Sequence, residues 1–360
     1  HSGAALADAY VKGIRNFDAV KAYEGMRLNA FSTPYLAKDY RDGKGRRAIR
    51  SYMDNGYIPL EDMVEEAFHT NEQTSRTLEY AYDDYAVAQM AKVLHDSCQD
   101  AALRQKYLED YNDLMRRSEN WRNVINPATG WADGRYENGK WENNEDLVHR
   151  KSYITEGATC HYTWYVPQNP EGLFEVIRNS KPMDKLEKQI EKTERKMEKK
   201  GETPVRNEKV IARLDKMFDN GWYWHGNEPC HQVAYLYDVA GAPEKTQERV
   251  HHILQTEYND TPGGLSGNDD AGQMSAWYVF SSIGFYPVCP GTPYYYIGTP
   301  SFDKVTLNLE NGRKFILSAD RQHIDDYLIQ SVTLNGKPLA DYRLSHQQIL
   351  TGGELHFQMK

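Results

Sequence analysis

The segment TSRTLEYAYDDYAVAQMAKVLHD, residues 74–96, carries the longest helical pattern in the chain and decides its fold class. Apolar residues return every three or four positions along it, which brings them to one face of an α-helix. A second face carries three acids, Glu79, Asp83 and Asp84. This acidic face either contributes to a cleft or is simply solvated.

Four further segments share this spacing of apolar residues. Turn-forming sequences separate the helical patterns: DGKG at 42–45, DNGYIP at 54–59 and NPATGWADGRYENGKW at 126–141. Helix and loop alternate without a repeat of fixed period, which indicates a mainly α toroid or irregular helical body rather than a solenoid. The four segments are residues 4–14, 17–30, 60–67 and 101–120.

Residues 184–200, DKLEKQIEKTERKMEKK, are almost entirely charged, with a thin apolar stripe of Leu186, Ile190, Thr193 and Met197. The segment is either a coiled coil that binds a partner or a solvated surface helix. We favour the surface helix, because three heptads are not filled.

After Pro290 the pattern changes to period-two alternation rich in β-branched residues. The runs KVTLNL, KFILSA, YLIQSVTLNG and ELHFQM are joined by the turn sequences ENGR, LNGKP and TGGE. We therefore expect a helical domain over residues 1–290 and a small antiparallel β unit over 291–360. With about four strands this unit has too little core to stand alone, so it packs on the helical body or completes a sheet elsewhere.

Composition narrows the classes of ligand. The 360 residues are 39% hydrophobic and carry a net charge of −9, with a pI near 5.8. This charge disfavours a nucleic-acid partner, and no apolar run is long enough to span a bilayer. The four cysteines form no CxxC pair, so a zinc cluster is not expected. The chain starts with a helical pattern and no signal peptide, so we expect further sequence before residue 1.

The loop SYITEGATCHYTWYVP, residues 152–167, places Glu156 before a glycine and near Tyr162, Trp164 and Tyr165. A carboxyl group in apolar, aromatic surroundings is costly to ionise and can stay protonated as a general acid. The alternative is that Glu156 only complements the dipole of the following helix. This stretch alone does not decide between the two.

The loop WYWHGNEPCHQ, residues 222–232, collects polar groups at a turn. Asn227 and Glu228 offer oxygen atoms, which suit Ca²⁺ or sugar hydroxyls. His225 and His231 lack the HExxH pattern of a zinc site. An ordinary helix start, with Asn227 as the cap and Pro229 just inside, explains only part of the loop.

The stretch GLSGNDDAGQMSAWY, residues 264–278, places Asn268, Asp269 and Asp270 between glycines at a helix entry. Capping needs one acid rather than two. A second carboxylate could hold and deprotonate a water molecule, with Gly267 and Gly272 allowing close approach of a ligand. Together with Glu156 these acids match the two-carboxylate chemistry of glycoside hydrolysis.

Five ordered motifs resemble glycoside hydrolase family 92, the calcium-dependent exo-acting α-mannosidases. They are TLEYAYDD, YITEGATCHYTWYVP, GNEPCHQVAYLYDVAGAPEKTQERV, GLSGNDDAGQMSAWYVFSSIGFYPVCPG and the closing FDKVTLNLENG with IQSVTLNGKPL. The resemblance implies an (α/α)6 toroid preceded by a β-sandwich domain, on the same precursor or a second chain. It also implies an inverting mechanism and a Ca²⁺ ion that binds mannose hydroxyls and helps to distort the ring.

Carried over by motif, Glu156 resembles the general acid, and Asp269 and Asp270 resemble the general-base region. We expect Asn227 and Glu228 to belong to the metal site. We expect the substrate, a glycan with α-linked mannose, α-1,2 above all, to contact His225, Asn227, Glu228, Asn268 and Gln273. A secreted, periplasmic or cell-surface location follows from the same resemblance.

The chain departs from the family at one motif, where EGATCHYTW replaces the usual EGNAWQYTW, and it covers only about the C-terminal half of such an enzyme. Two alternatives therefore remain. One is a non-catalytic carbohydrate-binding or interaction fragment of the same fold. The other is a metal-independent (α/α)6 hydrolase of the glucoamylase type.

Overall fold

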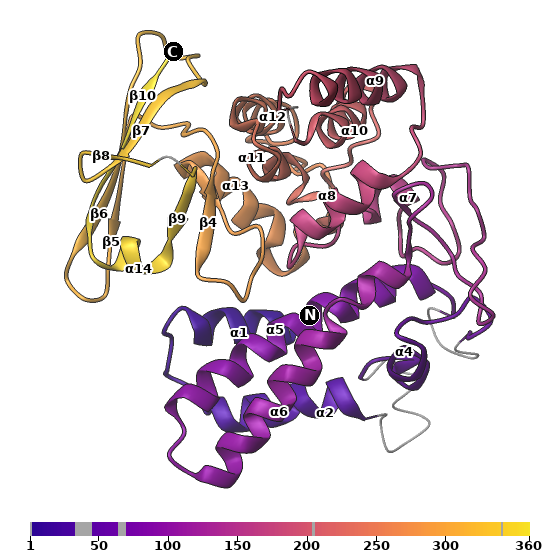
Figure 1. Cartoon of the computed structure of the whole chain (residues 1–360). Helices are drawn as coiled ribbons and strands as arrows, with labels where there is room; N and C mark the ends of the chain where they lie inside the picture. The colour runs from indigo at the N-terminus through magenta and orange to yellow at the C-terminus, as the bar shows by residue number, and fades with distance from the viewer. Residues whose placement is uncertain (1, 33–44, 64–69, 204–205, 340) are drawn as a thin grey trace. The chain divides into compact units, whose positions relative to one another are not determined.

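A computed structural model describes residues 2–32, 45–63, 70–203, 206–339 and 341–360. The chain divides into two compact units (Figure 1). The first comprises His1–Thr193 and Pro290–Thr292, and the second comprises Glu194–Cys289 and Pro293–Lys360. The mainly α class with a C-terminal β unit is confirmed, whereas the (α/α)6 toroid and the boundary after residue 290 stay predictions.

Helices dominate the first unit, and α5 and α6 pack side by side in it (Figure 1). Asp18 caps α2 by accepting from the Lys21 amide, and Asp100 caps α6 by accepting from the Leu103 amide. The elements are α1 (Ser2–Val11), α2 (Ala19–Phe31), α4 (Ile49–Asn55), α5 (Gln73–Ser97), α6 (Ala101–Arg117), η1 (Asn120–Asn123), β1 (Ile125–Asn126), β2 (Trp131–Ala132), α7 (Thr159–Tyr162) and α8 (Pro170–Asn179).

Four of the five expected helices in this part of the chain are confirmed by α1, α2, α5 and α6. The fifth, over residues 60–67, is wrong where it can be checked: residues 60–63 form a turn and an irregular stretch, and 64–67 lie outside the described residues. The short helix α4 was not predicted, because turn-forming sequences at residues 42–45 and 54–59 stand on both sides of it. Gly56, its C-cap, has a φ of 75°.

Asp84 holds the first unit together as a fully buried carboxylate. It accepts hydrogen bonds from Arg46, from Arg117 Nε at 2.9 Å and from the Tyr52 hydroxyl at 2.9 Å. These partners lie before and on α4 and at the end of α6. Of the two alternatives for the acidic face, the solvated one is therefore wrong for Asp84, because two guanidinium groups balance its charge inside the core.

The charged segment forms α9 (Lys185–Lys199), and most of its side chains are exposed. Leu186, in the expected apolar stripe, is 51% exposed. These exposures agree with a solvated surface helix. None of the described helices combines the length and apolarity that a bilayer crossing requires.

The second unit combines short helices with two sheets. All four strands expected from the alternating pattern are confirmed, as β5, β6, β7 and β10. The helices are α10 (Glu208–Asp219), η2 (Glu228–Cys230), η3 (Val233–Tyr235), α11 (Leu236–Ala240), α12 (Pro243–Thr256), η4 (Asp270–Gly272), α13 (Gln273–Ile283) and α14 (His346–Leu350). The strands are β3 (Phe285–Tyr286), β4 (Tyr294–Ile297), β5 (Lys304–Asn308), β6 (Lys314–Asp320), β7 (Ile329–Leu334), β8 (Lys337–Pro338), β9 (Arg343–Ser345) and β10 (Gly353–Met359).

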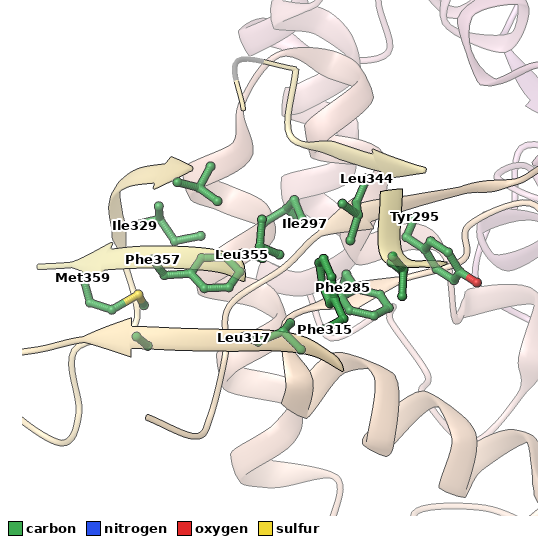
Figure 2. Close-up of a cluster of buried hydrophobic side chains, with 13 residues drawn as sticks. Phe285, Tyr295, Ile297, Phe315, Leu317, Ile329, Leu344, Leu355, Phe357 and Met359 are labelled. Carbon is green, nitrogen blue, oxygen red and sulfur yellow. The ribbon is translucent and has the colours of Figure 1, made fainter. Parts of the chain in front are cut away.

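The larger sheet has the strand order β5-β6-β10-β7-β8. Its pairings are antiparallel except between β6 and β10, which run parallel with Leu355 opposite Leu317, so the expectation of an antiparallel unit is wrong for this central pair. Alternate residues of these strands point into one apolar core, where Phe315, Leu355 and Phe357 are fully buried (Figure 2). Phe280 and Ile283 of α13 pack against the same core, so the sheet supports the helix that follows the Asp269 and Asp270 loop.

Replacing Asp84 with Asn removes the buried carboxylate that Arg46 and Arg117 share, and among the described residues leaves Arg117 only the longer pairing with Asp113 at 4.0 Å. Breaking a buried ion pair costs about 3–5 kcal/mol, so we expect a fall of that order in the free energy of unfolding, measured by denaturant titration. Asp96→Asn is the matched control, because Asp96 lies on the same helix but is 55% exposed and pairs with Lys92. A D84N loss no larger than that of D96N would show that Asp84 is not the organising group.

The buried carboxyl group of Asp238, on α11, should make the stability of the fold depend on pH. Both of its carboxyl oxygens are buried, no salt bridge reaches them from the described residues, and burial raises its pKa well above the ordinary value. In the unfolded chain the Asp238 carboxyl ionises at a pH of about 3.9, and in the folded chain it ionises only at higher pH. The contribution of Asp238 to the free energy of unfolding therefore falls as the pH rises above about 3.9. Asp238→Asn should therefore gain melting temperature over the parent by an amount that grows from pH 4 to pH 7.

The control for this pH series is Asp341→Asn, at a side chain that is 62% exposed. The difference in melting temperature between D341N and the parent should stay constant over the same pH range. A flat difference in melting temperature for D238N as well would contradict a raised pKa of Asp238 in the folded protein.

Candidate functional site

The loop that carries Glu156 is anchored to the start of α5. The Thr155 amide donates to Ser75 Oγ at 3.0 Å, and the two hydroxyl oxygens lie 2.8 Å apart. The Ser75 amide donates in turn to the Tyr153 carbonyl at 3.3 Å. Glu156 then takes a left-handed backbone conformation with a φ of 50°. The anchored loop therefore presents Glu156 in a defined direction.

The aromatic surroundings expected for Glu156 are only partly present. Tyr162 and Trp164 are buried, but Glu156 itself is exposed to solvent. The Tyr162 hydroxyl donates to Glu79 at 2.8 Å, and burial, with Glu79 nearby, raises the pKa of Tyr162 well above its ordinary value. Glu79 of the acidic helix face thus supports the core behind the loop. The aromatic rings fill that core and leave the Glu156 carboxylate in water.

Asp133 organises the neighbouring turns, and sequence reasoning missed it. Its side chain accepts from Asn126 Nδ2 at 3.1 Å and from the amides of Gly134 at 2.9 Å, Asn143 at 3.0 Å and Asn144 at 3.3 Å. Burial nevertheless raises its pKa. The available signal was an Asp–Gly pair inside a turn-rich stretch with several asparagines.

In the second unit, the 222–232 loop places Asn227 and Glu228 at its turn. Asn227 occupies the position before the short 3₁₀ turn η2, but its side chain makes no capping hydrogen bond among the described residues. Asn227 and Glu228 are both half-buried. The interpretation of this loop as an ordinary capped helix start therefore does not account for the Asn227 amide.

Two glycines bring this loop against the loop of Asp269 and Asp270. A Cβ atom on Gly267 would lie 2.4 Å from the Gly226 carbonyl oxygen, and one on Gly226 would lie 2.7 Å from the Ser266 carbonyl oxygen. A Cβ atom cannot occupy either place without displacing backbone. Asn227 and Asn268 follow directly after this contact, which brings the two polar segments to one site.

The two adjacent aspartates have different surroundings. Asp269 Oδ1 accepts from the Ser275 amide at 3.0 Å and from Ser275 Oγ at 2.8 Å, so it caps the first turn of α13. Both aspartates are exposed, but the Asp270 side chain makes no hydrogen bond among the described residues; Asp270 begins the short turn η4 before α13, with a φ of 43°. One carboxylate is therefore bonded to the first turn of α13, and the other is left without a hydrogen bond from the described residues.

His225 and His231 tie the site together through hydrogen bonds of defined direction. The Tyr258 hydroxyl donates to the Met274 carbonyl at 3.1 Å, so it accepts from His225 Nε2 at 2.6 Å. His225 Nδ1 then accepts from the Tyr223 hydroxyl at 2.7 Å. Every hydrogen-bonding atom of the His225 ring is thereby used by the protein.

His231 is bonded in the same manner. Its Nε2 donates to the His225 carbonyl at 2.9 Å, and its Nδ1 accepts from Gln273 Nε2 at 3.1 Å. Burial lowers the pKa of His225 to about 3, with His231 adding to the effect, and burial lowers the pKa of His231 to about 4. Both rings are neutral near pH 7, and neither has a nitrogen left for a zinc ion. We call the set Tyr223, His225, His231, Tyr258, Gln273 and Trp277 the histidine network.

The second unit thus brings together all the predicted site residues except Glu156. The contact of the two loops and the histidine network gather His225, Asn227, Glu228, Asn268, Asp269, Asp270 and Gln273. Glu156 belongs to the first unit. The acid candidate and the base candidates therefore lie on different compact units of one chain.

The donor atoms of the two loops suit a hard cation. Asn227, Glu228 and Asn268 offer amide and carboxylate oxygens, which Ca²⁺ prefers. Among the described residues, no three His, Cys, Asp or Glu side chains are grouped to hold a metal. A calcium ion at these loops would therefore also need backbone carbonyls, water or substrate hydroxyls to complete its shell.

Comparison with known proteins gives a consistent assignment. Among solved structures, a family 92 α-mannosidase from Bacteroides thetaiotaomicron is 34% identical, with a TM-score of 0.79, and the match covers 100% of this chain and 42% of that one. A family 92 inverting mannosidase from the same species is 32% identical, with a TM-score of 0.80 and coverage of 100% and 45%.

A relative described as an uncharacterized secreted glycosidase, from Arthroderma benhamiae, is 29% identical over 98% of this chain and 44% of its own length. The chain spans less than half the length of each of these three proteins. The family model of the glycosyl hydrolase family 92 catalytic domain matches residues 1–360. With this match over its whole length, the chain belongs to glycoside hydrolase family 92.

Proposed function

We propose that the protein is an exo-acting α-mannosidase that releases mannose from α-linked glycans, α-1,2 linkages above all, with inversion at the anomeric carbon. Membership of family 92 and the likeness to two mannosidase structures support this substrate class. The observation that carries the mechanism is the different bonding of the two exposed aspartates: Asp269 accepts from Ser275, whereas the Asp270 side chain makes no hydrogen bond among the described residues.

In the proposed reaction, Glu156 donates its proton to the glycosidic oxygen as the bond from that oxygen to the anomeric carbon breaks. Asp270 takes a proton from the water molecule that attacks the opposite face of that carbon. The water oxygen forms the new bond to the sugar, and the two carboxyl groups exchange protonation states overall. Inversion follows from this single displacement.

The remaining site residues would bind and orient the sugar. Asn227 and Glu228 would hold the calcium ion, which when bound supplies a positive charge that binds sugar hydroxyls and favours a distorted ring. Asn268, His225 and Gln273 would face the substrate from the same unit. Because Tyr223 and Tyr258 saturate the His225 ring, we expect His225 to contribute shape rather than a new hydrogen bond.

The proposal extends to the parts that surround the catalytic domain. An N-terminal β-sandwich domain, on the same precursor or as a second chain, would complete the enzyme; the two solved relatives are more than twice as long as this chain. A secreted, periplasmic or cell-surface location fits the relative described as secreted.

Glu156→Gln and Asp270→Asn should each lower kcat on an α-mannoside by about 10²–10⁴-fold, the usual contribution of a general acid or base. Asp269→Asn is the matched control, because the amide oxygen of Asn can still accept from Ser275. We expect it to keep kcat within about tenfold of the parent, since it keeps the cap. Hydrolysis rates and melting temperatures of the three variants check these outcomes.

Three outcomes would count against the proposal. An unchanged rate for E156Q removes Glu156 as the acid. A D269N loss equal to that of D270N refutes the different roles of the aspartates. A folded parent protein that binds mannosides without hydrolysing them supports the non-catalytic carbohydrate-binding alternative.

Removal of calcium gives a separate prediction. Dialysis against EDTA should abolish hydrolysis, and added Ca²⁺ should restore it, because the proposed ion binds the sugar through its hydroxyls. Glu228→Gln should raise the Kd for Ca²⁺, measured by calorimetry, while Glu257→Gln, an exchange in the same unit outside the two loops, should not. Hydrolysis that is unaffected by EDTA would favour the metal-independent hydrolase instead.

A further inference from the structure

The residues that aim Asp270 have an unusual backbone. Asp270, Ala271 and Gly272 are three consecutive residues in the left-handed region, with φ values of 43°, 57° and 95°. For residues other than glycine this conformation costs about 1–2 kcal/mol each. Such a run persists only where the surrounding structure holds it from both sides.

Asp269 holds this run from the N-terminal side. Its carbonyl accepts from the amides of Gly272 at 3.1 Å and Met274 at 3.3 Å. Its side chain accepts from Ser275, as described above. These bonds fix the ends of the run relative to each other, but they do not fix the run relative to the 222–232 loop.

The histidine network holds the run from the C-terminal side. His231 Nδ1 accepts from Gln273, the residue directly after the run, and the His231 carbonyl accepts from Trp277 Nε1 at 2.9 Å, one helical turn later. The Tyr258 hydroxyl donates to the Met274 carbonyl between them. One buried side chain therefore joins the first turn of α13 to the loop that carries Asn227 and Glu228.

We propose that His231 is a positioning residue for the general base: its bond to Gln273 holds the left-handed run in the orientation that directs the Asp270 carboxylate at the attacking water. His231 is buried and contacts neither substrate nor the reacting atoms in this proposal. The inference rests on the proposed function of Asp270. It adds that the His231 ring links the proposed general base to the 222–232 loop.

The two nitrogens of His231 can be tested separately. His231→Asn places an amide oxygen near the position of Nδ1 and keeps an acceptor for Gln273. His231→Gln extends an amide nitrogen toward the position of Nε2 and keeps a donor for the His225 carbonyl. Both variants lose the packing of the ring, but only H231N keeps the acceptor for Gln273. A difference between them therefore reports on the Gln273 bond and not on the loss of packing.

We expect H231Q to lower kcat on an α-mannoside by about 10–100-fold with KM within twofold, since misplacement by about 1 Å can cost about 10²-fold. H231N should keep kcat within about threefold of the parent. Hydrogen exchange of residues 266–278, followed by mass spectrometry, should speed up in H231Q and stay near the parent in H231N. His252→Gln, at an exposed histidine of α12, controls for loss of an imidazole.

Equal effects of H231N and H231Q on kcat and on exchange would overturn the inference, because a purely structural ring would not distinguish them. If either variant unfolds, Tyr258→Phe, which removes only one hydroxyl, should still increase exchange at 272–275; unchanged exchange there overturns the inference too. A parent protein without hydrolysis refutes the proposed function instead, and an exchange difference between H231N and H231Q would still support the role of His231 in holding the run.

Discussion

The backbone contact between Gly226 and Gly267 is the constraint on which the candidate site depends. It leaves no room for a Cβ atom on either residue, because such an atom would lie 2.7 Å or less from backbone of the facing loop. Two segments about forty positions apart in sequence can therefore place Asn227 and Asn268 at one location. The local reason for both glycines is steric, and their effect is to bring the two loops of the candidate site together.

Buried polar groups then determine which segments are joined, because their hydrogen bonds are directional and apolar packing is not. In the first unit, Asp84 joins α5 to Arg46, Tyr52 and Arg117 through directional bonds. In the second unit, the two histidines play the same part, with each ring nitrogen assigned to a specific partner. Such groups tolerate little rearrangement, since an unpaired buried donor or acceptor costs free energy.

The candidate acid and base differ in how they are held. Glu156 extends from a loop anchored by Ser75, whereas Asp270 precedes a helix whose first turn is bonded on both sides. Both carboxylates are exposed, so apolar burial within the described residues does not prepare either for its role. In the proposed mechanism their protonation would be set when substrate enters and excludes water.

The sequence by itself determined α1, α2, α5 and α6 of the first unit, the four main strands and the family, because their signals are local: spacing of apolar residues, alternation and ordered motifs. It also showed that Asp269 and Asp270 are two acids at a helix start where capping needs only one. Only the tertiary structure decided which of them caps α13, because Ser275 and Asp269 meet through the fold of the turn. The burial of Asp84 and the parallel pairing of β6 with β10 were likewise decided in three dimensions, since each depends on partners distant in sequence.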